Sequence, residues 1–161
     1  MKKQKLDAVS LEIQWKRLVS MVDEASAAFV RTSFSVLVRE ANDFAVVLTD
    51  AQGRSIAQSV LSIPSFIGTL PATVKHFLRK FPPHTLKPGD VMITNDPWMG
   101  TGHIHDVNIA MPIFYKKKIV AFAAVVSHMP DIGGRIRNAG ISGSPSPDLR
   151  VRTPTAPSAR G

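Results

Sequence analysis

The chain has 161 residues, of which 44% are hydrophobic and 20% charged, a composition typical of a globular domain that can bury a core. It lacks cysteine, which excludes disulfides and thiolate metal sites, and no apolar run reaches the length of a membrane span, so we expect a cytoplasmic protein. The formal net charge of +8 lies at the ends, because residues 6–131 hold 12 basic and 11 acidic residues, and a nucleic-acid-binding face is therefore not expected.

A long amphipathic helix is predicted for residues 7–33, because apolar residues recur there at alternating steps of four and three. Asp7 or Ser10 can cap its start. The apolar stripe contains Leu11, Trp15, Leu18, Val22, Ala25 and Phe29. We interpret this segment as a helix that packs on the core.

The next segment brings charge close to a buried strand. Residues 33–44 are mixed in character, residues 44–48 have the pattern of a buried strand, and a turn at residues 50–53 lets residues 54–60 return as its hairpin partner. Arg39 precedes that strand. Its guanidinium could form a local ion pair, or it could hold a substrate carboxylate or phosphate through a bidentate contact.

A second amphipathic helix is predicted for residues 70–81, after a loop at residues 63–68. Pro71 suits the first turn of that helix. Residues 91–94 then form a short strand, which runs directly into a polar, glycine-bearing loop. A loop displayed in this way at the end of a strand commonly carries binding residues.

A β-hairpin over about residues 106–128 is the central prediction. Two apolar runs, at residues 107–115 and 119–127, lie on either side of a break of lysines at residues 116–118. Both faces of these runs are largely apolar, which indicates strands inside a sheet that is covered on both sides.

The same short pattern, His-x-x-Asp, stands at each flank of the hairpin: His103 with Asp106, and His128 with Asp131. Facing residues of an antiparallel hairpin have position numbers with a constant sum. A turn centred on Lys117 therefore places His103 opposite Asp131 and Asp106 opposite His128. The hairpin would bring two imidazoles and two carboxylates together at its open end, provided that the strand register is not shifted by one residue.

Imidazole and carboxylate groups together suit Zn, Mn or Fe(II). All four side chains could bind one ion, or three could bind while the fourth orients a ligand. The alternative is a buried polar network in which the carboxylates accept hydrogen bonds from the imidazoles and no metal is held. His105 shares a face with His103 if the strand has begun there. It is a weaker candidate ligand than the other four residues, because the constant sum of position numbers places no acidic residue opposite it.

The sequences NDPWMGTGHIHD and SHMPDIGG resemble a pattern of the hydantoinase B/oxoprolinase family, close to N-D-P-x-x-G-x-x-H-x-x-D followed by H-x-x-D-I-G-G. The resemblance spans roughly residues 8–138. The matching positions are Asn95, Asp96, Pro97, Gly100, His103, Asp106, His128, Asp131, Ile132, Gly133 and Gly134.

The resemblance implies ATP-dependent opening of cyclic amides such as 5-oxoproline or hydantoins. A hydantoinase A-like partner subunit would handle ATP, and the B part would complete the hydrolysis. The four His and Asp residues of the two patterns would hold a divalent Mn, Zn or Fe ion that polarises a carbonyl or activates a water. Asn95 and Asp96, which open the pattern, are the catalytic candidates, and Arg39 is the substrate-binding candidate.

These features predict an α+β fold in which two amphipathic helices pack on a largely antiparallel sheet. Residues 1–138 would be the N-terminal portion of a hydantoinase B-like domain, and residues 139–161, rich in Pro, Ser, Gly and Arg, a low-complexity, disordered tail. Family members are much longer. We therefore expect a truncated chain that lacks the C-terminal part of the B subunit and is inactive as an isolated fragment. The alternative is a non-catalytic domain that retains only its binding to the partner subunit.

Overall fold

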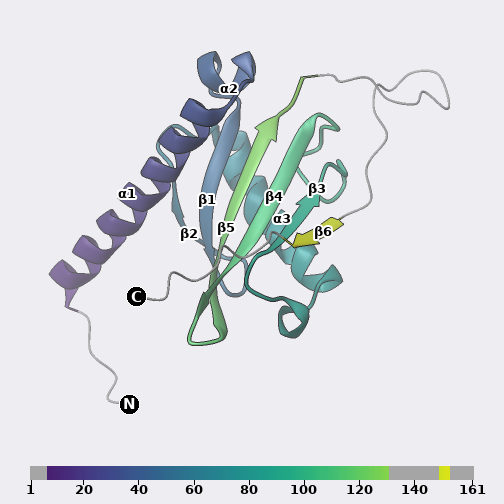
Figure 1. Ribbon diagram of the computed structural model, residues 1–161. Coiled ribbons are helices and arrows are strands. Elements are labelled where there is room, and N and C mark those ends of the chain that lie inside the picture. The colour runs from purple at the N-terminus through teal and green to yellow at the C-terminus, as the bar shows by residue number, and fades with distance from the viewer. Residues whose placement is uncertain (1–6, 131–148, 153–161) are drawn as a thin grey trace, which may run out of the picture.

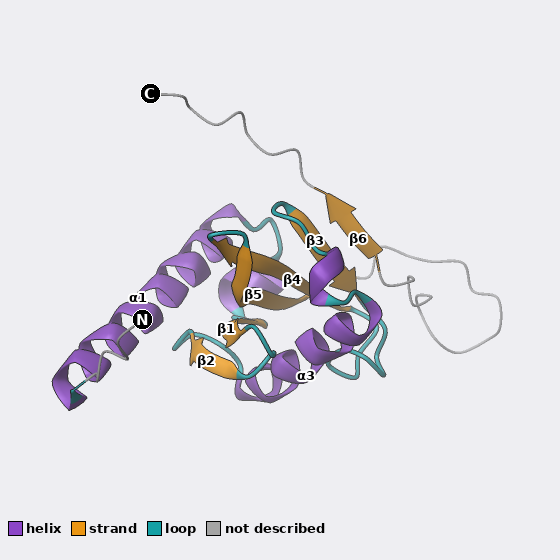
Figure 2. Ribbon diagram, turned by 90° about the horizontal axis from the view of Figure 1, so that it is seen from below, coloured by secondary structure: helices purple, strands orange, loops and turns teal. Residues whose placement is uncertain are grey.

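The computed structural model describes residues 7–130 and 149–152 of the chain. These residues form α1 (Ala8–Thr32), α2 (Val36–Glu40), β1 (Phe44–Asp50), β2 (Ser55–Gln58), α3 (Pro64–Lys80), a 3₁₀ turn (Pro83–Thr85), β3 (Asp90–Thr94), β4 (Asp106–Tyr115), β5 (Lys118–His128) and β6 (Leu149–Arg152). The strands make one antiparallel sheet in the order β2-β1-β5-β4-β3-β6, with helices on both of its faces (Figures 1 and 2). The predicted α+β class is confirmed.

The β4–β5 hairpin has the predicted register over most of its length, from Asp106 paired with His128 to Ile113 paired with Ala121. Its turn consists of Lys116 and Lys117, whose φ angles of 46° and 65° lie in the left-handed region. Two such residues match the right-handed twist of the flanking strands, which explains a two-residue connection here. A bulge just before the turn compensates for the shorter connection, so the predicted pairing farther along the strands is preserved.

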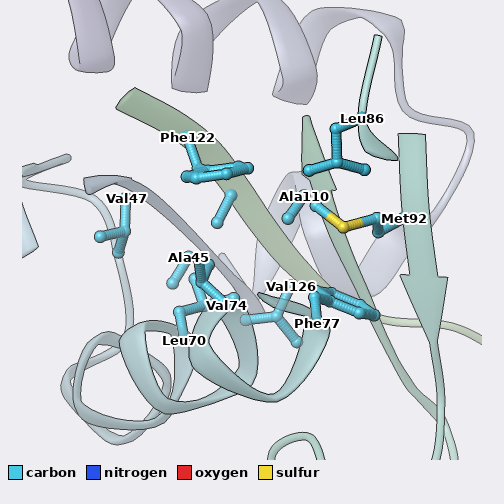
Figure 3. Packing of buried hydrophobic residues seen from close by; sticks show 11 residues of the cluster. Ala45, Val47, Leu70, Val74, Phe77, Leu86, Met92, Ala110, Phe122 and Val126 are labelled. Atoms are coloured by element: carbon cyan, nitrogen blue, oxygen red, sulfur yellow. The ribbon is translucent and has the colours of Figure 1, made fainter. Parts of the chain in front are cut away.

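The core lies on both faces of the sheet, because successive side chains of a strand point to opposite sides. In β1, Ala45 and Val47 pack toward α3, whereas Phe44 and Val46 pack toward α1. Figure 3 shows the larger cluster, in which Phe122 lies among side chains of the strands and α3. The buried members of this cluster are Ala45, Val47, Leu70, Val74, Phe77, Leu86, Met92, Ala110, Phe122, Ala124 and Val126.

The first helix forms as predicted, but only the part from Leu18 onward packs on the core. Asp7 caps it, and the backbone and hydroxyl of Ser10 donate to the Asp7 carboxylate and lower its pKa. Val22 is 6% exposed, whereas Leu11 and Trp15 are 56% and 59% exposed. The prediction that the whole stripe packs on the core is wrong, because the first half of α1 extends beyond the sheet (Figure 1).

Two substitutions in α1 test this division. Trp15→Ala is expected to change the free energy of unfolding by no more than about 0.5 kcal/mol, because the side chain is exposed in this chain. Val22→Ala removes two buried carbons and should lower that free energy by about 2 kcal/mol. Urea unfolding of both variants checks the difference, and equal losses would show that the first half of the helix packs as well.

The helix α3 is longer than predicted, since it begins at Pro64 and includes most of the predicted loop at residues 63–68. Pro64 occupies its first turn, where the missing N–H costs nothing. Pro71 therefore lies inside the helix rather than at its start. The helix tolerates this proline because its buried face, which includes Leu70, Val74 and Phe77, is held against the sheet.

Three further segments differ from expectation. Residues 36–40 of the mixed segment form the short helix α2. Leu149–Arg152, inside the predicted tail, pairs with β3, while the remainder of that tail lies outside the described residues. The hairpin was predicted to be covered on both faces. Met111 and Val120 are nevertheless 43% and 44% exposed, so the face opposite α3 is only partly covered.

Among the helices described, none is long and apolar enough to span a membrane.

Candidate metal centre

The candidate site lies at the end of the hairpin remote from its turn, where β4 begins with Asp106 and β5 ends with His128. These two residues are a directly facing pair. Strand alternation places Asp106 on the same side as the buried Asn108, and His128 on the same side as Val126. His128 Nδ1 lies 3.0 Å from Asp106 Oδ1, so the two halves of the doubled pattern meet as the register predicts.

A folded loop between β3 and β4 carries the other two histidines. The side chain of Asp96 accepts from the backbone N–H of Trp98 at 2.9 Å, and that of Asn95 donates to the carbonyl of Ile104 at 3.2 Å. The hydroxyl of Thr101 donates to Asp106 Oδ2 at 2.7 Å. These hydrogen bonds hold the loop against the start of β4, which fixes the positions of the residues near its end.

The rings of His103, His105 and His128 gather into one cluster. Their centroids are 4.7 Å apart for His103 and His105, 5.0 Å for His103 and His128, and 5.4 Å for His105 and His128. His105 Nδ1 lies 3.3 Å from His103 Nε2. One ring nitrogen of each residue lies within 4.8 Å of those of the other two.

Two carboxylates flank this cluster. Asp106 is 2% exposed, and besides its contact with His128 its Oδ1 lies 3.8 Å from His103 Nδ1. Asp43 Oδ2 lies 3.8 Å from His128 Nδ1, and the Asp43 carbonyl accepts from the His128 backbone N–H at 3.1 Å. The 3.0 Å contact with Asp106 orients the His128 ring, whereas the two contacts at 3.8 Å are too long for hydrogen bonds and add only negative charge beside the rings.

The donor set fits a divalent transition metal. Imidazole nitrogens are ligands for Zn, Fe, Co and Ni, and a flanking carboxylate that orients a ligating histidine is a usual feature of such sites. These residues could therefore hold one ion at the open end of the hairpin.

The structure brings together three of the four predicted metal ligands, His103, Asp106 and His128. Asp131 lies outside the described residues, so its pairing with His103 stays a prediction.

The remaining predicted site residues are Asn95, Asp96 and Arg39. Asn95 and Asp96 hold the loop, and their catalytic role stays a prediction. Arg39 is exposed in the last turn of α2, and its contact with substrate also stays a prediction.

Two residues at the site were ranked low or missed by sequence reasoning. His105 ranked below the others because the facing arithmetic assigns it no acid, yet it lies in the ring cluster. Asp43 was not considered a site residue. It stands immediately before β1, and the pairing of Phe44 with Ser127 places it beside His128. The only signal for Asp43 was its position before a buried strand, and the pairing of that strand with β5 could not be inferred.

Gly100 is expected to tolerate no larger side chain. A Cβ at this position would lie 2.5 Å from Nδ2 of the buried Asn108 and 3.2 Å from the carbonyl oxygen of Asp96. Gly100→Ala should therefore lower the free energy of unfolding by about 1–3 kcal/mol. Gly68→Ala is the matched control, since a Cβ there meets nothing within 4 Å and the helix should gain about 0.5–1 kcal/mol. Thermal unfolding compares the two variants, and equal shifts would contradict the crowding at Gly100.

The fold and the ring cluster define an α+β domain with a candidate metal centre at the open end of its central hairpin. A family model described as hydantoinase B/oxoprolinase matches residues 7–144, and the chain belongs to this family. The family resemblance carried by the two motifs is thereby confirmed.

Several longer proteins resemble the chain in sequence. It is 30% identical over 131 residues to a protein of Pseudomonas sp. (strain NS671) assigned as the B subunit of a D-/L-hydantoinase, a match that covers 80% of this chain and 22% of that protein. It is 31% identical over 128 residues to 5-oxoprolinase 1 of Arabidopsis thaliana, covering 80% of this chain and 10% of the relative. The chain thus spans less than a quarter of the length of these relatives.

Two solved structures share the fold. An ATP-dependent caprolactamase from Pseudomonas jessenii is 24% identical with a TM-score of 0.77, and the match covers 92% of this chain and 27% of that one. The nucleotide-free structure of an acetone carboxylase is 24% identical with a TM-score of 0.67, and covers 76% of this chain and 16% of the other. At this identity the likeness establishes the fold alone.

Proposed function

We propose that this chain supplies the metal-binding part of an ATP-linked enzyme that opens cyclic amides such as 5-oxoproline or a hydantoin. It would hold a divalent Mn, Zn or Fe ion. A hydantoinase A-like partner subunit would handle ATP, and the C-terminal part of a B subunit would complete the site. The cytoplasmic location and the domain boundary near residue 138 stay predictions of the sequence.

One observation carries the proposal: the 3.0 Å contact between His128 Nδ1 and Asp106 Oδ1, which joins the two family motifs at one point. The names of the relatives support the substrate class, since 5-oxoproline, hydantoins and caprolactam are all cyclic amides. The relative assigned as a hydantoinase B subunit supports the need for a second polypeptide. The exposed apolar side chains of Leu11 and Trp15 are suited to a contact with further polypeptide.

The residues of the chain have distinct parts in this chemistry. A divalent ion, when bound, supplies a Lewis acid that polarises a carbonyl or activates a water. An ionised carboxylate can only accept a hydrogen bond, so Asp106 keeps the proton of His128 on Nδ1 and leaves the lone pair on Nε2. Thr101 and Asn95 hold the loop, which keeps His103 and His105 beside that ring.

Reconstitution tests the proposal. The chain would be combined with a hydantoinase A-like subunit and the remaining part of a B subunit, and ring opening of 5-oxoproline, hydantoin and caprolactam measured with ATP. We expect hydrolysis that needs ATP and a divalent ion, and that falls by about a hundredfold or more with Asp106→Ala. His84→Ala, a change in an exposed histidine outside the ring cluster, should leave the rate unchanged.

Two results would overturn the proposal. Hydrolysis that survives both chelation and Asp106→Ala would show that the ring cluster takes no part in the reaction. An assembly that forms but opens none of the three rings, with a chain that carries no metal, would instead support a domain that only binds its partner subunit.

A further inference from the structure

We infer that a hollow beside the turn of the β4–β5 hairpin is a binding site for a small organic phosphate, that is, a phosphate group carried on an apolar or aromatic body. Lys117 and Lys118 hold the phosphate, and the apolar wall consists of Leu86, Phe114 and Ile119. The hollow lies at the end of the hairpin opposite the candidate metal centre (Figure 1), about 30 Å away, because β4 has 10 residues that rise about 3.3 Å each. The inference is therefore independent of the proposed function.

Three separate segments form this hollow, which has a volume of about 410 Å³. They are the turn between β1 and β2, the chain just before β3, and the turn end of the hairpin. A volume of this size lies within the range of small-molecule sites, about 300–1,000 Å³. Leu86 is 5% exposed, and Phe114 and Ile119 pack against the larger core cluster. A ligand would thus meet a wall that the core already holds in place.

A β-bulge in the hairpin shapes this wall. The pairing of Ile113 with Ala121 is followed by that of Phe114 with Ile119, so Val120 is an extra residue on β5. An extra residue shifts the alternation of side chains beyond it. Ile119 therefore packs beside Phe114 against the core cluster, whereas Val120 is 44% exposed. The bulge in this way places an apolar wall directly beside the two lysines of the hollow.

Positive charge in the hollow is not neutralised by its surroundings. Lys117 and Lys118 are exposed, and none of the described residues that line the hollow is acidic. Asp50, which precedes the β1–β2 turn, accepts from Arg54 Nε at 2.6 Å and from two backbone N–H groups, so its charge is already paired. Lysine ammonium groups bind phosphate as point charges, which suits an anion held at the mouth of an apolar hollow.

The hairpin turn contains residues that its shape disfavours. Lys116 and Lys117 have φ angles of 46° and 65°, and a turn with two left-handed residues favours Asn-Gly or Asp-Gly. A residue with a Cβ is strained in this region, so lysines at both positions lower stability. Departures of this kind are concentrated at functional sites. Of the two, Lys117 lines the hollow, whereas Lys116 Nζ lies 5.3 Å from the centre of the Tyr115 ring.

Titration of the full chain with phenyl phosphate, followed by ¹H–¹⁵N NMR spectra, tests the inference. We expect the backbone signals of Gln52, Lys117 and Lys118 to shift to saturation, while those of the ring cluster stay in place. Inorganic phosphate should bind about tenfold more weakly, because it lacks the apolar body. Benzoate should bind about fivefold more weakly, because a carboxylate carries a smaller charge than a phosphate.

Two substitutions in the turn distinguish a bound phosphate from diffuse electrostatic attraction. Lys117→Gly and Lys116→Gly each remove one charge from the same turn, and glycine suits the left-handed φ at both positions. Neither variant should unfold below the wild-type temperature, which thermal unfolding checks. Lys117→Gly should weaken phenyl phosphate binding by about tenfold or more, because a charge-assisted contact is lost. Lys116→Gly should weaken it by less than about threefold, because exposed charges are screened by salt.

Four results would overturn the inference. The first is that phenyl phosphate at about 10 mM leaves the signals of the hairpin turn in place. The second is an equal loss of affinity in the two glycine variants, because the lysines would then act only as a diffuse positive surface. The third is equal affinity for inorganic phosphate and phenyl phosphate, since the apolar wall would then take no part. The fourth is a chain that binds no phosphate but whose Lys117→Gly variant assembles less well with a partner subunit, which would assign the turn to a protein contact.

Discussion

Replacement of His128 with alanine is expected to reduce the affinity for a divalent ion by more than about a hundredfold while the fold persists. His128 ends β5, and its ring lies 5.0 Å from that of His103 and 5.4 Å from that of His105, so its removal takes away one side of the cluster. It also leaves the buried Asp106 without its imidazole partner. Equilibrium titration with Zn²⁺ or Co²⁺ measures the change.

The fold should survive His128→Ala because the backbone of residue 128 keeps its pairing with Asp106 and its hydrogen bond to the Asp43 carbonyl. His84→Ala, which removes an exposed histidine from a different loop, should leave ion binding unaltered. Undiminished binding by the His128 variant, with its secondary structure intact, would place the ion elsewhere on the chain.

Phe122→Ala is expected to lower the free energy of unfolding by about 3–5 kcal/mol. Phe122 is fully buried in the middle of β5, where it pairs with Thr49 of β1 and Pro112 of β4. Its ring is a fully buried member of the cluster shown in Figure 3, so alanine would leave a large cavity. Chemical denaturation, with fits that compare both midpoint and slope, gives the loss.

Phe34→Ala supplies the comparison for Phe122, because the same residue type is there 100% exposed. That change should stay within about 0.5 kcal/mol of the wild-type free energy of unfolding. A similar loss at both positions would contradict the packing of the sheet against α3, and with it the support for the central hairpin.

The hairpin register could be predicted because it depends on short-range features. Two apolar runs on either side of a lysine-rich break fix the fold-back, and the left-handed φ angles of Lys116 and Lys117 show how the chain makes the turn. The constant sum of the position numbers of facing residues then places Asp106 opposite His128 without knowledge of the rest of the fold. The same arithmetic gives His105, which lies before the first paired residue of β4, no acidic partner, so it ranked His105 low although the ring lies in the cluster.

The parts that could not be predicted depend on contacts between segments far apart in the sequence. Asp43 reaches the site because β1 pairs with β5, a pairing that no local pattern reveals. Likewise, the apolar stripe of α1 predicts a buried face but not where the sheet ends, so the exposure of Trp15 became clear only in the structure. The extra turns of α3 arise from Pro64 and a buried face that outweigh the effect of Pro71.

Anomalous diffraction from crystals grown with Zn²⁺ tests most directly whether the hairpin end is a metal centre. We expect one peak at the open end of the hairpin, beside the rings of His103 and His128 and the carboxylate of Asp106, with ring nitrogens at about 2.0–2.1 Å from the ion. A zinc peak elsewhere on the chain, or none between these rings in a crystal whose protein is otherwise folded as described, would contradict the assignment.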